Sequence, residues 1–366
     1  ERLNTSSADL QGRGIAGALL TGVFPAAVTL ETPAGIAVTA ELLEQELEKS
    51  WASCAVEKDG GDDPDVTNGT LVFAKVSLAD TPGVAIDGGP GVGRVTKPGL
   101  DQPVGAAAIN STPRRMIAEE LQAVAAVHGY AGGFAVEISI PAGEALAKKT
   151  FNPRLGIVGG ISVLGTGGIV RPMSEAALIA TTAAELSTLY AAGKRHVLVT
   201  PGNYGEDFSR DVLGLDLTSW ALCSNYVGDA IDRAVSLGFE SFLLVGHLGK
   251  LIKVAGGAMN THSHTADGRR ETLTAHAALC GADQPLLQKL FGCLTTDEAI
   301  PLLDEAGLRA AVMESIARAL SENLRHRAGE RMAIEALFFS NRYGILGQTA
   351  GASQLLAIHQ HREEQP

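Results

Sequence analysis

The sequence predicts an α+β domain over residues 1–150, followed by an α/β domain over residues 151–366 that contains a parallel sheet and ends in helices. Strand and helix patterns mix irregularly before residue 150, alternate after it, and become mostly helical beyond Glu271. Such alternation is typical of a parallel sheet with helices across its faces. The length of 366 residues fits two domains.

The first domain begins with a weak pattern. Three glycines interrupt any helix in the first twenty residues, namely Gly12, Gly14 and Gly17. Alternating β-branched residues around a turn at residues 33–35 predict two strands over residues 26–40. Apolar residues spaced for one helix face then predict a helix over residues 41–56: Leu42, Leu43, Leu47 and Trp51.

Three more elements complete this domain. Alternation predicts a strand over residues 70–78 and another over residues 134–143. Between them we expect a helix over residues 109–130, with Ser111 or Thr112 as its cap and a proline in its first turn.

The second domain is expected to open with a strand over residues 154–165 and a glycine loop. A helix over residues 174–193 follows and stops at Gly193, a residue that suits a helix C-terminus. Buried strands are predicted over residues 196–200 and 241–247, on either side of a helix that ends at Gly238.

Three successive strands of this domain are followed by glycine-bearing loops: "GTGGIV", "TPGNYG" and "GHLGK". Ligands of parallel α/β sheets bind outside the carboxyl ends of the strands, and a glycine loop that leads into a helix suits phosphate or carboxylate. We therefore predict one ligand crevice at this edge. The alternative is that Gly159 and Gly160 only allow chain segments to pack closely.

Composition argues against several classes of partner. The net charge of -12 and the lack of a basic stripe argue against nucleic acid and membrane surfaces. No apolar run is long enough to span a bilayer, and we find no signal peptide, so a cytoplasmic location is expected. The cysteines have no paired spacing for zinc or disulfides: Cys54, Cys223, Cys280 and Cys293.

Known nucleotide and metal motifs are also missing. The strand over residues 196–200 ends in Pro201 and Gly202, where a nicotinamide enzyme needs an acid, and no Gly-Lys-Ser/Thr occurs. The acidic turn at residues 62–65 lacks the calcium-loop order, and His262 with His264 lacks a third strong ligand. No metal site is predicted.

Basic residues gather beside the Gly/Pro-rich stretches. Eleven of the 29 cations lie there: Lys97, Arg114, Arg115, Lys148, Lys149, Arg154, Arg171, Lys250, Lys253, Arg269 and Arg270. In an acidic protein this placement indicates a polycarboxylate or phosphate ligand. Ordinary surface charge is the alternative.

The order of motifs resembles the CbiD family, the cobalt-precorrin-5B (C-1) methyltransferases of anaerobic cobalamin biosynthesis. The blocks are "KDGGDDPDVTNG", "GVGRVTKPGL" with "GAAAINSTPRRMI", "IPAGEALAKKTFNPRLGIVGGISVLGTGGIVRPMS", "PGNYG", "SNYVGDAIDRAVSLGF" and "VGHLGKLIKVAGGAMNTHSHTADGRRE". The resemblance implies S-adenosylmethionine as methyl donor and a cobalt-bearing, carboxylate-fringed tetrapyrrole as acceptor. A homo-oligomer is possible, and a non-catalytic tetrapyrrole or nucleotide carrier is the alternative function.

The resemblance also gives the candidate residues their roles. Those expected to bind the donor are Gly159, Gly160, Gly165, Thr166, Gly167, Gly168, Gly202 and Asn203. Those expected to bind the acceptor are Asp62, Asp63, Asp65, Lys97, Arg114, Arg154, Lys250 and Arg269. If the reaction needs an acid or base, the candidates are Asp101, His247 and His262.

Overall fold

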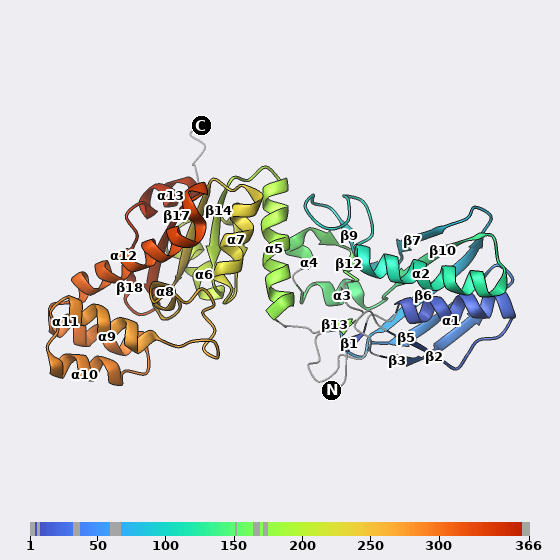
Figure 1. Cartoon of the computed structure of the whole chain (residues 1–366). Helices are drawn as coiled ribbons and strands as arrows, with labels where there is room; N and C mark the ends of the chain where they lie inside the picture. The colour runs from blue at the N-terminus through green and yellow to red at the C-terminus, as the bar shows by residue number, and fades with distance from the viewer. Residues whose placement is uncertain are drawn as a thin grey trace. The chain divides into compact units, whose positions relative to one another are not determined.

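The chain forms two compact units, Glu1–Ala177 and Leu178–Pro366, which Figure 1 shows in a computed structural model. The structure describes residues 4–5, 8–31, 37–58, 67–150, 152–163, 169–170 and 175–360. The predicted mixed α/β class is confirmed. The boundary between the units lies later than the division predicted after Thr150, because two short strands beyond that residue pair within the first unit.

The first unit is built on a five-stranded sheet in the order β4-β5-β6-β10-β7. Its neighbours are antiparallel except for the parallel pair of β10 and β7. Two helices, α1 and α2, lie together along the sheet (Figure 1). The bounds are β4 Leu43–Leu47, β5 Trp51–Glu57, β6 Leu71–Ala79, β7 Val84–Gly88, β10 Gly133–Ser139, α1 Ala8–Thr21 and α2 Ser111–His128.

Helix α1 corrects the prediction that the first twenty residues form no helix. Its glycines serve close packing: a Cβ atom on Gly14 would lie 2.6 Å from Leu42 Cδ1 and 2.9 Å from Val28 Cγ2. Gly12 is buried near Ile117 and Leu121 of α2. Burial against the sheet and α2 therefore overrides the low helix propensity of glycine.

The helix predicted over residues 41–56 is also wrong, because this segment forms the antiparallel strands β4 and β5. The leucine spacing that suggested one helix face is interrupted by a register shift between Leu43 and Glu46, and Glu44 there has φ +46°. Strand β5 buries Cys54 and its neighbours in the core of the first unit. The strands predicted over residues 70–78 and 134–143 are confirmed as β6 and β10.

Short elements complete the first unit. The predicted strand pair over residues 26–40 is confirmed as β2 and β3. The long strand predicted over residues 154–165 is wrong. In the described part of that range, residues 154–163, α4 ends at Leu155 and the short strands β11 and β12 follow, pairing with β9 and β8. The bounds are β1 Asn4–Thr5, β2 Ala27–Glu31, β3 Ala37–Glu41, β8 Gly91–Val92, β9 Arg94–Val95, β11 Ile157–Val158, β12 Gly160–Ile161, β13 Ile169–Val170, α3 Gly143–Ala147 and α4 Asn152–Leu155.

The second unit contains a five-stranded sheet in the order β15-β14-β16-β17-β18. Its first four strands are parallel, and β18 is antiparallel to β17. The predicted strands β14 and β16 are confirmed, whereas the mostly helical pattern beyond Glu271 concealed β17 and β18. The bounds are β14 His196–Thr200, β15 Trp220–Leu222, β16 Ser241–His247, β17 Ala333–Ser340 and β18 Gly344–Gln348.

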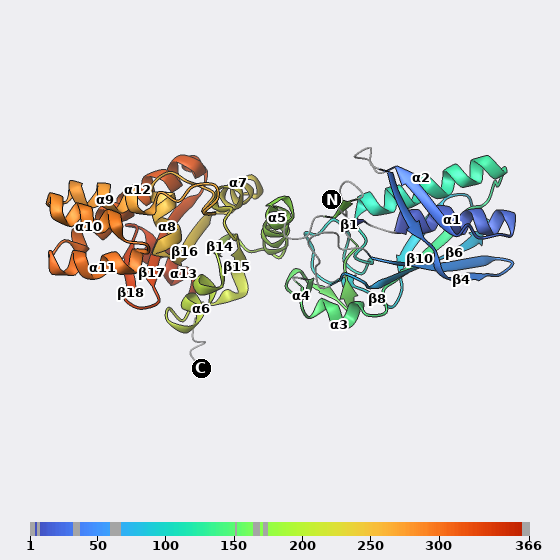
Figure 2. The same ribbon diagram turned by 90° about the horizontal axis from the view of Figure 1, so that it is seen from below.

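Helices cover both faces of this sheet (Figure 2). Val197 and Val199 of β14 pack with α7, α8 and α12, whereas Leu198 packs on the other face with α6 and α13. The predicted ends of α5 and α7 at Gly193 and Gly238 are confirmed. The helix bounds are α5 Glu175–Ala191, α6 Asn203–Asp211, α7 Val227–Leu237, α8 Leu248–Ala255, α9 Arg269–Leu279, α10 Gln284–Gly292, α11 Thr296–Glu305, α12 Arg309–Ala328 and α13 Ala352–His359.

Strand β15 forms one edge of this sheet, and α5 supplies its missing partner. Thr182 Oγ1 donates to the carbonyl oxygen of Leu222 at 2.9 Å, and Glu185 Oε2 accepts from the Leu222 N–H at 2.9 Å. Both outward-facing backbone groups of Leu222 are thus satisfied by side chains of the helix. Among the described residues, we find no helix with the length and apolar character needed to cross a membrane.

Candidate functional site

The second unit has a topological switch point between β14 and β16. The chain passes from β14 to β15 on one side and then crosses to β16 on the other. This order, 2-1-3-4-5 along the sheet, places ligands at the carboxyl ends of the two strands that flank the switch point. A pocket of about 420 Å³ lies at these ends. It is lined by Pro201, Gly202, Tyr204, Gly205, Asn225, His247, Gly249, Lys250, Lys253, Thr261, His262, Ser263, Arg269 and Asn341.

Two helices begin at this pocket, which we call the switch-point pocket. Helix α6 starts directly after Gly202, and α8 starts directly after His247. Gly205 in the first turn of α6 lets the helix approach the sheet, because a Cβ atom there would lie 2.7 Å from the carbonyl oxygen of Val245. Helix N-termini direct free N–H groups and a positive dipole end toward a ligand. The pocket is therefore suited to an anion.

Lys250 joins the strand ends beneath the pocket. Its Nζ donates to the carbonyl oxygen of Pro201 after β14 and to Asn225 Oδ1 at 3.0 Å after β15. Burial lowers the pKa of Lys250. We find no carboxylate among its hydrogen-bond partners in the described chain, so its positive charge is balanced only by dipoles.

Two further cations share one carboxylate. Lys253 is 4% exposed, and its Nζ donates to the carbonyl oxygen of Thr261 at 3.2 Å. The same Nζ lies 3.7 Å from Asp267 Oδ1. Arg269 holds both oxygens of Asp267, at 2.5 and 2.8 Å, and this hydrogen bonding lowers the Asp267 pKa to about 2. Burial lowers the pKa of Lys253, and the Asp267 charge only partly offsets that effect.

His247 uses both ring nitrogens within the protein. Its Nδ1 accepts from the Gly249 N–H at 3.1 Å, which caps α8. Its Nε2 faces Asp297 Oδ1 at 3.7 Å, and Ser340 Oγ donates to Asp297 Oδ2 at 2.9 Å. Burial lowers the pKa of His247 although the charge of Asp297 raises it. Because Nδ1 accepts the hydrogen bond from Gly249, it carries no proton, and the ring positions the start of α8.

The structure brings together four predicted candidates from three separate segments: Gly202, His247 with Lys250, and Arg269. Exposed His262 joins them, with its Nδ1 accepting from the His264 N–H, and Asn203 is the first residue of α6. Sequence reasoning missed Asn225, Asp297 and Asn341 as residues of this region. Asn341 has no sequence signal of its own, since it reaches the pocket only because the unpredicted strand β17 lies beside β16.

Other candidates lie in the first unit. Asp101 accepts from the backbone N–H of Ser111 and thus caps α2, so its pKa is lowered although burial opposes this. The side chain that caps α2 is thus Asp101, ten positions before Ser111, and not Ser111 or Thr112 as predicted. Arg114 is held by carbonyl oxygens, including Ile109 at 2.8 Å. Lys97 Nζ donates to the carbonyl oxygen of Arg154 at 3.4 Å.

The structure describes part of the predicted glycine site. A Cβ atom on Gly160 would collide with the carbonyl group of Gly91 and lie 2.8 Å from the Gly93 N, so Gly160 permits a close crossing of β12 and β8. Gly159 is exposed with φ +83°. Of the "GTGGIV" loop the structure describes Ile169 and Val170, which form β13 and pair with β1 instead of joining the sheet of the second unit. The candidates outside the described residues are Asp62, Asp63, Asp65, Gly165, Thr166, Gly167 and Gly168.

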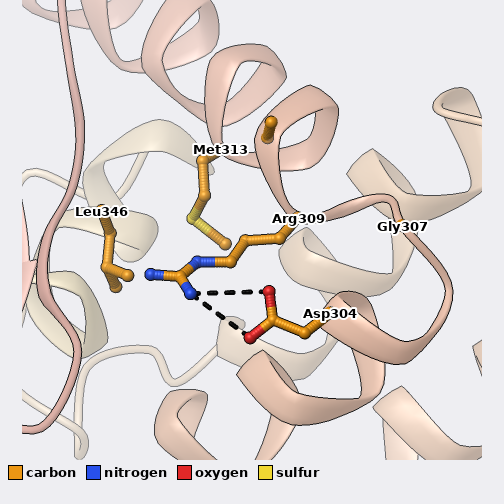
Figure 3. A pocket seen from close by; sticks show the side chains of 6 residues that line it. Asp304, Gly307, Arg309, Met313 and Leu346 are labelled. Atoms are coloured by element: carbon orange, nitrogen blue, oxygen red, sulfur yellow. Dashed lines mark hydrogen bonds and ion pairs between the residues drawn. The ribbon is translucent and has the colours of Figure 1, made fainter.

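A second pocket, of about 380 Å³, lies between the α11–α12 turn and β18 (Figure 3). Arg309 crosses it toward Leu346, next to Met313, and pairs with Asp304 at 3.3 Å. The guanidinium also faces the ring of Tyr343 at 5.7 Å. In this second pocket the one cation of the lining, Arg309, is paired with a carboxylate. In the switch-point pocket the cations of the lining outnumber the adjacent carboxylates.

Comparisons with known proteins identify the family. The CbiD family model matches residues 7–172, and the model of the CbiD C-terminal domain matches residues 260–350. A cobalt-precorrin-5B C(1)-methyltransferase of Ruminiclostridium cellulolyticum is 50% identical over 314 residues, which cover 86% of this chain and 82% of the relative. One of Photorhabdus laumondii is 45% identical over 332 residues, covering 90% and 87%.

A solved structure is also similar, the cobalamin biosynthesis protein (cbiD) of Archaeoglobus fulgidus. It is 28% identical, with 74% of this chain and 84% of that chain covered and a TM-score of 0.38. The two family models and the extent of the sequence identity show that this chain belongs to the CbiD family.

Proposed function

We propose that this chain transfers a methyl group from S-adenosylmethionine to C-1 of cobalt-precorrin-5B. The observation that carries the proposal is 50% identity to a cobalt-precorrin-5B C(1)-methyltransferase across 86% of this chain. S-adenosylmethionine would supply an activated methyl group on a sulfonium sulfur. The acceptor would be a tetrapyrrole fringed with carboxylates, and the switch-point pocket supports this reading because its cations and helix N-termini suit carboxylates.

The residues of the chain would act mainly by positioning. Arg269 and Lys253 would hold a carboxylate of the acceptor, and the first turn of α6 would add backbone N–H donors beyond Gly202. Holding two reactants in line can supply a large part of a rate enhancement. His247 would not act as the base in this arrangement, since both of its nitrogens face protein groups. The donor-binding roles of residues 165–168 stay predictions.

The test is a methyl-transfer assay under anaerobic conditions. Pure protein is incubated with methyl-labelled S-adenosylmethionine and cobalt-precorrin-5B, and we expect the label in the tetrapyrrole together with S-adenosylhomocysteine. Arg269→Ala should lower kcat/KM about 10- to 100-fold, the equivalent of losing ~1.5–3 kcal/mol of charge-assisted bonding. Arg327→Ala is the matched control, because Arg327 pairs with Asp232 at 2.5 Å and lies outside the pocket. Tetrapyrrole that is bound without receiving label would contradict the proposal.

A further inference from the structure

We propose that the switch-point pocket receives the carboxylate arms of the acceptor, not the methyl donor, and that Tyr204 is the platform on which the flat tetrapyrrole ring rests. This inference rests on the proposed function and deepens it. It assigns one of the two reactants to this pocket and names a specificity-determining side chain. The charge of the pocket and the exposure of Tyr204 support it independently.

The charge of the pocket distinguishes the two reactants. Its lining contains three cations and no carboxylate: Lys250, Lys253 and Arg269. Adjacent Asp267 neutralises one of them, and Asp297 lies on the far side of the His247 ring. Even with both carboxylates counted, a net positive charge remains. S-adenosylmethionine has a net positive charge of its own, so the pocket repels it, whereas the acidic arms of the acceptor are attracted.

Burial strengthens this preference. Lys253 is almost completely buried, and desolvation lowers the pKa of both Lys250 and Lys253. A protonated lysine in such surroundings is stabilised by an added negative charge. A ligand carboxylate would thus satisfy cations for which the described chain provides too few counter-ions.

The pocket is large enough for the arms of the acceptor. It measures about 420 Å³ and lies at the ends of β14 and β16. Short acetate and propionate chains fit such a space. With the arms held there, the ring lies at the mouth, where it requires a flat apolar surface.

Tyr204 provides that surface. It lines the pocket from the first turn of α6 and is 68% exposed. All five tyrosines lie in the described part of the chain, and Tyr204 is exposed whereas the other four are buried or half-buried. Its hydroxyl makes no hydrogen bond to any residue that the structure describes, so the exposed ring is left for an aromatic contact. Flat conjugated rings bind to aromatic side chains by stacking on them, and this stacking does not require specific hydrogen bonds.

The experiment measures binding with three probes on the full chain. Uroporphyrin I is a flat tetrapyrrole with acetate and propionate arms, citrate is a polycarboxylate without a ring, and S-adenosylmethionine is the donor itself. We expect Tyr204→Ala to weaken uroporphyrin binding about tenfold, equal to about 1.4 kcal/mol. Its binding of citrate should not change. Tyr204→Phe should bind uroporphyrin like the unaltered chain, because the phenyl ring is kept. Val212→Ala, another exposed position just beyond α6, is the control.

The charge is tested in the same assay. Arg269→Ala should weaken uroporphyrin and citrate alike, whereas Arg327→Ala should weaken neither. Equal uroporphyrin affinity of Tyr204→Ala and the unaltered chain would overturn the inference, and so would competitive displacement of uroporphyrin by S-adenosylmethionine. These outcomes are separate from the methyl-transfer result: a chain that transfers methyl groups but binds uroporphyrin independently of Tyr204 and Arg269 refutes the inference alone.

Discussion

Gly205 offers a sharp test of how the pocket is built. It lies in the first turn of α6, where the helix meets β16, and a Cβ atom would lie 2.7 Å from the carbonyl oxygen of Val245 and 2.8 Å from Thr200 Cβ. The oxygen belongs to a fully buried backbone segment that has little room to move. Gly205→Ala must therefore displace α6, by about 0.7 Å if the contact is to relax from 2.7 Å to 3.4 Å.

Two opposing effects set the magnitude. Alanine improves helix propensity by about 1 kcal/mol relative to glycine. Overpacking in a dense interior costs about 1–3 kcal/mol, and here the nearest atom is backbone. We expect Gly205→Ala to lower the free energy of unfolding by about 1 kcal/mol. For a unit of this size the melting temperature should fall by about 2–4 °C.

The assay is thermal and urea unfolding of Gly205→Ala beside Gly292→Ala. Gly292 ends α10 in the same unit, with no atom within 4 Å of its hypothetical Cβ, so its substitution should be neutral or stabilising. Movement of α6 should also weaken uroporphyrin binding. Equal or greater stability of Gly205→Ala, with unchanged binding, would refute the close packing of α6 on β16.

Three further predictions follow from packing and charge. In α1, Gly14→Ala should destabilise the first unit by about 1–3 kcal/mol, whereas Gly17→Ala, which meets no atom within 4 Å, should stabilise it by up to ~1 kcal/mol in urea unfolding. Burial lowers the pKa of His359 to about 4. The free energy of unfolding should therefore fall by up to ~3 kcal/mol as the pH drops from about 6.5 to 4. In thermal melts, His359→Gln should show a weaker dependence on pH. The hydrogen bonds from Arg269 lower the pKa of Asp267 to about 2, so the contribution of this ion pair to stability should be complete above pH 4 and lost toward pH 2. Carboxyl NMR should show a higher pKa for Asp267 in Arg269→Ala.

Patterns within single elements were predicted well from the sequence. The buried strands β14 and β16 and the glycine-ended helices α5 and α7 have local signals, namely apolar runs and C-terminal glycines. The loops after β14 and β16 were correctly expected to meet, because parallel neighbours end at one edge.

Other features depend on distant contacts that no local pattern reveals. Gly14 forms part of a helix only because Leu42 and Val28 fill the space beside it. Gly160 resembles a ligand loop in sequence, but it serves a crossing with Gly91 that lies far away in the chain. Strand β17 follows a long run of helices, and without it the position of Asn341 could not be foreseen.

The edge of the second sheet has a consequence for association between copies of the chain. Proteins with open strand edges risk growth of the sheet by addition of a foreign strand. On β15, the groups of Leu222 that would receive such a strand are already held by Thr182 and Glu185. Helix α5 thus occupies this edge, so a strand of another copy cannot pair with Leu222.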